Sequence, residues 1–225
     1  MASQRDLDVA LVEAAEEGTL DEIRSLLDRH ANVNAVDADT WTPLHYASLN
    51  GHHQCVELLL DRHANVNAVD ADTWTPLLHA SRTGHHQCVE LLLDRHASVT
   101  AVEYNNWTPL HHASSNDHDR CVELLLDRHA NVNAAGFNNT TPLHRASRYG
   151  HHQCVELLID RGADKSIKTV RDDGRGSLLH LLLMYQPSLT NPFDAQRLGQ
   201  TPEQVAATSE IAQLIRDRGI LSYLS

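Results

Sequence analysis

The chain lacks the features that mark membrane and secreted proteins. No apolar run reaches the roughly 18 residues that a transmembrane helix needs. Residues 1–8 have neither a positively charged segment nor an apolar core, so we identify no signal peptide. There is no C-x-x-C pair among the four cysteines. These absences predict a cytosolic or nuclear protein that does not enter a membrane.

Positive charge is also scarce. The sequence has 18 Lys and Arg against 30 Asp and Glu, for a formal net charge of −12. A chain with this balance is poorly suited to a polyanion, because phosphate backbones are bound through clustered Lys and Arg. Nucleic acid is therefore not expected as the main partner.

Against this background one motif recurs at a fixed interval. A stretch of the form T-P-L-H-x-A, with Leu-His in place of His-x in the second copy, starts every 33 residues at Thr42, Thr75, Thr108 and Thr141. Thr is a good helix N-cap, since its hydroxyl can accept a hydrogen bond from an unpaired backbone N–H. Pro in the next position gives up an N–H that would be unpaired there. Each copy therefore predicts the start of a helix.

A 33-residue period built on this motif resembles the ankyrin repeat. The resemblance implies an all-α solenoid of helix-turn-helix units with β-turn tips, concave on the tip side. Residues 26–44 and 59–77 are identical, which indicates recent duplication or design by copying. We predict an N-terminal capping repeat at 1–36, four full repeats, which we call units one to four, at 37–69, 70–102, 103–135 and 136–168, and degenerate C-terminal repeats or a cap at 169–225 with an insertion at about 186–198.

The units depart from the ankyrin pattern where the family usually has glycine. Two residues before each motif threonine stand Thr40, Thr73, Asn106 and Asn139. After the second helix stand His30, His63, His96 and His129, and Asp117 replaces an inter-helix glycine. Asn tolerates a left-handed backbone better than β-branched Thr does, so we expect the first two tips to be strained.

The four cysteines also follow the period, at Cys55, Cys88, Cys121 and Cys154. Equivalent positions in stacked units lie about one helix diameter apart, roughly 10 Å. A disulfide needs Cα atoms within about 7 Å. We therefore predict four reduced thiols in the core.

Seventeen histidines raise the question of metal binding or catalysis, but most of them recur by the same period. The ankyrin resemblance makes the T-P-L-H histidine a framework residue. Copies one unit apart are too distant to share a zinc ion, whose Zn–N bonds are about 2.1 Å. We expect no metal, cofactor or enzyme activity. The alternative is an activity grafted on the scaffold, natural or engineered, with a Cys/His pair acting as a nucleophilic hydrolase.

Aromatic side chains are rare, yet they gather on one predicted surface. Each of the three Trp residues directly precedes a motif threonine, on a tip. Further aromatics lie on tips and near the first helices, and Arg145 and Arg148 lie at the C-terminal end, whereas Asp37, Asp39, Asp70 and Asp72 lie on the first tips. Since aromatics and Arg are common interface anchors, we predict a partner-binding surface of Trp41, Tyr46, Trp74, Tyr104, Trp107, Phe137, Arg145, Arg148 and Tyr149. The alternative is that the Trp side chains only pack between tips.

The resemblance implies a non-enzymatic scaffold or adaptor that binds another protein through the concave tips and first helices. We expect a monomer in the absence of the partner. The family resemblance also implies that asparagines in the A-x-V-N return can be hydroxylated, here at Asn34, Asn67 and Asn133, while Thr100 would escape.

Overall fold

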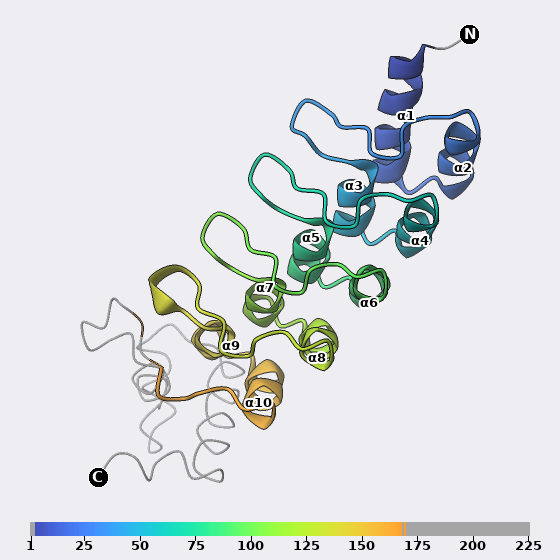
Figure 1. Cartoon of the computed structure of the whole chain (residues 1–225). Helices are drawn as coiled ribbons and strands as arrows, with labels where there is room; N and C mark the ends of the chain where they lie inside the picture. Colours follow the sequence, from blue (N-terminus) through green and yellow to red (C-terminus); the bar gives the residue numbers. More distant parts are fainter. Residues whose placement is uncertain (1–2, 168, 170–225) are drawn as a thin grey trace, which may run out of the picture.

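The computed structural model describes residues 3–167 and residue 169. This part of the chain forms ten α-helices and one short 3-10 helix, and it contains no strand (Figure 1). The helices are α1 Gln4–Glu17, α2 Leu20–Asp28, α3 Pro43–Leu49, α4 His53–Asp61, α5 Pro76–Thr83, α6 His86–Asp94, α7 Pro109–Ser115, α8 Asp119–Asp127, η1 Phe137–Asn139, α9 Pro142–Tyr149 and α10 His152–Asp160. The predicted C-terminal cap and its insertion at about 186–198 lie outside the described residues.

Successive helices form antiparallel pairs, and the pairs stack in chain order. The first helices α1, α3, α5, α7 and α9 form one row, the second helices α2, α4, α6, α8 and α10 form another, and the tips project beside the first row (Figure 1). Each pair packs on its sequence neighbours, as in other repeat proteins. The prediction of an all-α solenoid is confirmed.

The helix starts follow from the motif. The hydroxyl oxygens of Thr42, Thr75, Thr108 and Thr141 each accept a hydrogen bond from the backbone N–H three residues later. Pro follows each threonine at the first helical position. The predicted N-caps are therefore confirmed.

The core is a double row of leucines at the repeat period. In the first helices Leu44, Leu77, Leu110 and Leu143 are fully buried, and in the second helices the same holds for Leu59, Leu92, Leu125 and Leu158. The four cysteines lie among them, free and buried. The prediction of reduced thiols in the core is confirmed.

Several non-glycine residues adopt the left-handed conformation. Thr40 and Thr73 both have φ of 66°, and Asn106 has φ of 63°. The histidines after the second helices behave alike, with φ between 63° and 67° at His30, His63, His96 and His129. A β-branched residue is disfavoured in this region, so the first two tips carry the backbone strain that the sequence predicts.

A periodic histidine ties each second helix to the preceding unit. The ring Nε2 lies 3.1 Å from the carbonyl oxygen of Glu16 in His52 and 3.0 Å from that of Ser115 in His151. Gly18 makes room for this ring, because a Cβ there would lie 2.6 Å from His52. These histidines link neighbouring units, which agrees with a structural role.

The tip of unit four differs from the others. Residues 137–139 form the 3-10 helix η1 instead of the expected β-turn, and Gly136 stands where the other units have Asp37, Asp70 and Glu103. A Cβ on Gly136 would lie 2.5 Å from the ring of Trp107. The missing side chain lets that indole pack against the tip of the next unit.

Candidate partner-binding surface

An acidic residue at the start of each of the first three tips holds the tryptophan in place. One carboxylate oxygen of Asp37 accepts hydrogen bonds from the N–H groups of Asp39 and Trp41, both at 2.9 Å. Asp70 and Glu103 make the equivalent pairs of bonds in their tips. Asp70 is 6% exposed, so it adds little to the surface charge of the tips, whereas Asp39 and Asp72 are exposed. Sequence reasoning missed this role, although the recurrence of an acid four residues before each Trp is a signal for it.

Each indole packs on two side chains that share one register of the first helices. That register holds Tyr46, His79, His112 and Arg145. The ring of Trp41 lies 5.0 Å from Tyr46 in its own unit and 4.4 Å from His79 in the next. Tyr46 is half-buried, and its hydroxyl donates to Asp37 at 2.6 Å.

The same arrangement continues along the stack. Trp74 lies 5.0 Å from His79 and 4.5 Å from His112. Trp107 lies 5.5 Å from His112, and the guanidinium carbon of Arg145 lies 4.2 Å from the Trp107 ring centre. We call this alternating series the tryptophan ladder; it comprises Trp41, Trp74, Trp107, Tyr46, His79, His112 and Arg145. It runs without a break through units one to four.

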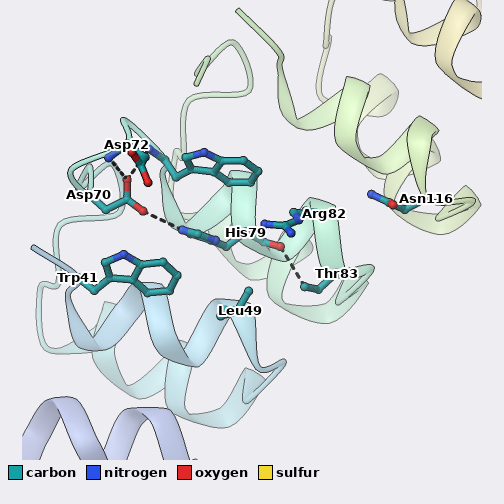
Figure 2. A pocket seen from close by; sticks show the side chains of 9 residues that line it. Trp41, Leu49, Asp70, Asp72, His79, Arg82, Thr83 and Asn116 are labelled. Carbon is teal, nitrogen blue, oxygen red and sulfur yellow. Dashed lines mark hydrogen bonds and ion pairs between the residues drawn. The ribbon is translucent and has the colours of Figure 1, made fainter. Parts of the chain in front are cut away.

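Two hollows open along the ladder. The first has a volume of about 450 Å³, and its lining includes Trp41, Trp74, Asp72, His79 and Arg82. Figure 2 shows this hollow from close by. The second, of about 490 Å³, is lined by Ser115, Asn116, Arg145, Tyr149 and His151. A surface of this kind can take side chains of a protein segment, because both aromatic and polar side chains line each hollow.

Exposure divides the predicted binding residues into two groups. Tyr104, Phe137 and Tyr149 are 85%, 58% and 50% exposed, and Arg148 is exposed as well. The three Trp residues are instead half-buried, since each packs between neighbouring units. The three Trp side chains therefore do pack between tips, as the alternative interpretation says. Whether they also contact a partner stays a prediction.

The histidine of the motif makes a hydrogen bond to the next unit in unit one, but in unit two the shifted histidine bonds a residue of its own unit. In unit one, His45 Nδ1 lies 2.8 Å from the Thr42 hydroxyl, and Nε2 lies 3.1 Å from the carbonyl oxygen of Trp74. Leu78 occupies the equivalent position in unit two. The shifted His79 places its Nε2 3.2 Å from Asp70 instead (Figure 2).

The double variant Leu78→His with His79→Tyr, which copies unit one, should be more stable than His79→Tyr alone. The new imidazole can bond the Trp107 carbonyl, and the new hydroxyl can bond Asp70 as Tyr46 bonds Asp37. We expect a gain of about 1 kcal/mol, the usual net value of one hydrogen bond. Urea unfolding of both variants measures it, and equal stability of the two would contradict this role of the framework histidine.

Burial sets the charge state of the histidines in and beside the ladder. It lowers the pKa of His45 and His79, in the latter case against the opposing effect of Asp70. It lowers the pKa of His111 to about 4 and that of His112 to about 3. These four rings are therefore neutral at pH 7.

The cysteines offer no activated nucleophile. Burial raises the pKa of Cys88, Cys121 and Cys154 to about 12, and that of Cys55 also rises. Since the thiolate is the reactive form, the geometry does not favour the Cys/His hydrolase. In the described part of the chain, no group of three or more His, Cys, Asp or Glu side chains is placed to hold a metal ion.

Native thiols should react slowly with a disulfide reagent, and the chain should run as a monomer on a non-reducing gel. Burial and the raised pKa both oppose attack, so unfolding in urea should speed the reaction of all four thiols strongly. Ellman titration with and without urea measures this. Four thiols that titrate at once under native conditions would contradict the buried position.

The asparagines of the A-x-V-N return connect neighbouring units. The side-chain oxygen of Asn34 accepts from the N–H of Asn65, that of Asn67 from Ser98, and that of Asn133 from Asp164. Unit two has Thr100 at this position, whose hydroxyl lies 3.2 Å from that of Ser98 in the same unit. Hydroxylation of the three asparagines stays a prediction.

Comparison with known proteins agrees with the architecture. The family described as ankyrin repeats (3 copies) matches residues 11–103 and 98–169. The chain belongs to the ankyrin-repeat family. Ankyrin repeats are generally protein–protein interaction modules, and the family is typically non-enzymatic. A search of curated proteins finds no match. Within residues 3–167, no helix has the length and apolar character to cross a bilayer.

Proposed function

We propose that this chain is a non-enzymatic adaptor that binds a segment or surface of another protein along its tips and first helices. The observation that carries the proposal is the tryptophan ladder, which runs through four units beside the exposed rings of Tyr104 and Phe137. Large aromatic side chains that are held in place lose little conformational entropy on binding and are frequent hot spots. We propose that the partner contacts Trp41, Tyr46, Trp74, Tyr104, Trp107, Phe137, Arg145, Arg148 and Tyr149.

The surface of the second helices is polar, unlike the aromatic surface of the tips and first helices. Their surface carries exposed Glu57 and Glu90 and a row of ion pairs between units, such as Arg95 with Asp61 at 2.7 Å. Exposed pairs of this kind contribute little free energy. No large aromatic side chain lies on α4, α6, α8 or α10. We therefore place the partner on the opposite, tip-side surface.

Charge and thiol chemistry complete the proposal. A net charge of −12 supports a protein partner and not a nucleic acid. Four buried free thiols support a reducing compartment, the cytosol or the nucleus. The chain acts as a monomer until it meets its partner, and it needs no cofactor.

The test is capture of a partner with the intact chain, followed by affinity measurements with matched variants. Tyr104→Ala and Phe137→Ala remove exposed rings that the fold does not need, whereas Glu57→Ala and Glu90→Ala alter the second helices. Loss of an anchor can cost about 2 kcal/mol, roughly thirtyfold in affinity. We expect the ring variants to bind more weakly and the glutamate variants to bind normally. The reverse pattern would move the site to the second helices.

A further inference from the structure

Arg145 is a half-buried cation that contacts two aromatic rings and two hydroxyl groups. Its guanidinium lies 4.2 Å from the ring centre of Trp107 and 4.9 Å from that of Tyr149. Its Nε donates to the Ser115 hydroxyl at 2.8 Å, and Nη2 donates to the Tyr149 hydroxyl at 3.1 Å. Burial lowers the pKa of Arg145. No carboxylate among the described residues pairs with it.

This is unusual within the chain itself. At the ends of the second helices, Arg62, Arg95, Arg128 and Arg161 are each paired with an aspartate of the preceding unit. Each of those arginines has its carboxylate partner although 35–38% of its side-chain surface is exposed. A partly desolvated charge is costly unless it is paired. Within the described residues this guanidinium has no carboxylate partner, so its remaining N–H groups are available to an anion from another molecule.

The hollow beside Arg145 presents donors and few acceptors. A guanidinium has five N–H groups, and the two bonds described above leave three for a ligand. Tyr149 accepts from Arg145, so its own hydroxyl proton can be donated. Asn116 uses one amide N–H on the carbonyl of His112 at 2.9 Å and keeps the other. Asp117, which follows Asn116 in the chain, lies 3.6 Å from His151 Nδ1, and no ion pair joins it to Arg145.

We propose that the hollow of Ser115, Asn116, Arg145, Tyr149 and His151 is an oxyanion pocket. Its occupant is the oxyanion of a partner's side chain, a carboxylate or a phosphorylated hydroxyl. The guanidinium, fixed between two rings, offers the planar set of donors that such groups bind with two parallel hydrogen bonds. This inference deepens the proposed function and rests on it for the source of the anion.

The direct test is a titration of the intact chain with inorganic phosphate and, separately, with acetate, at pH 7 and constant ionic strength. The reporter is the Nε–H resonance of Arg145 in a ¹H–¹⁵N NMR spectrum. We expect a saturable shift with a dissociation constant on the order of 1–10 mM, as for a few charge-assisted hydrogen bonds. A shift that stays linear in anion concentration, or that is equal at Arg145 and Arg148, would overturn the pocket.

Two variants sharpen the test. Ser115→Asp places a carboxylate next to Arg145 Nε and should abolish the saturable shift while Arg145 and its rings remain. Arg148→Gln removes an exposed arginine of the same helix and should leave the shift unchanged. Saturable binding that survives in Ser115→Asp would contradict the assignment.

Comparing phosphate with acetate also distinguishes a phosphorylated side chain from a carboxylate as the occupant of the pocket. Phosphate that binds at least tenfold more tightly than acetate identifies a phosphorylated side chain as occupant, whereas similar binding identifies Asp or Glu. Failure of both titrations removes the pocket but not the adaptor function, which is tested by the ring variants Tyr104→Ala and Phe137→Ala. If anions bind but Tyr104→Ala and Phe137→Ala bind the partner normally, the pocket is supported and the proposed adaptor surface is contradicted.

Discussion

Lowering the pH from 7 to 5 should destabilise the fold by several kcal/mol. His111 and His112 have pKa values lowered by burial to about 4 and about 3, whereas an unfolded histidine titrates near 6.5. Between these values the unfolded chain binds more protons than the folded one. Stability is therefore present above pH 6.5 and is lost as the pH falls, by about 2 kcal/mol for each of the two rings between pH 7 and 5.

Urea unfolding followed by circular dichroism at both pH values measures this loss. The variant His112→Tyr, which copies Tyr46 at the same register, should lose about 2 kcal/mol less on acidification than the parent does. His86→Gln, at an exposed position on α6, is the matched control and should keep the full pH dependence. Equal pH dependence in His112→Tyr and the parent would show that this ring does not carry the effect.

Truncation of a leucine in the central row should have an effect of similar size. Leu92 is fully buried in α6 between the helices of neighbouring units, and Leu92→Ala should cost about 2–5 kcal/mol through lost contacts and the cavity that remains. Leu91→Ala, one residue earlier and only half-buried, is the matched control with a smaller loss.

The effect of Leu92→Ala should also be local, because each unit contacts only its neighbours. Hydrogen exchange resolved by residue measures this. We expect amides of α5 to α8 to lose more protection than those of α1 and α2. A uniform change from α1 to α10 would contradict a stack stabilised by nearest neighbours.

The period and the motif chemistry were sufficient to predict most of the fold. Thr before Pro predicts a capped helix start at each copy, and one apolar register predicts the buried rows of Leu44 and Leu59. These features depend on contacts within a unit or between identical positions of adjacent units. The tip of unit four was not predicted, because its shape depends on the Trp107 ring of the previous unit meeting Gly136.

The candidate site was predictable in composition but not in geometry. The sequence places Trp41, Trp74 and Trp107 on the tips, yet it cannot show that each indole packs on side chains of two units. The shift from His45 to His79 is visible in the motif, but its bond to Asp70 requires the position of the ring. The environment of Arg145 depends on Ser115 and Trp107, which are 30 and 38 residues away along the chain.

Hydroxyl-radical footprinting of the chain with its captured partner tests the central claim most directly. If the partner lies along the tryptophan ladder, oxidation of Tyr104, Phe137 and Tyr149 should fall in the complex, while oxidation of His86 and His152 at the exposed start of the second helices should not change. Protection of those two histidines with unchanged oxidation of the three rings would contradict the proposed binding surface.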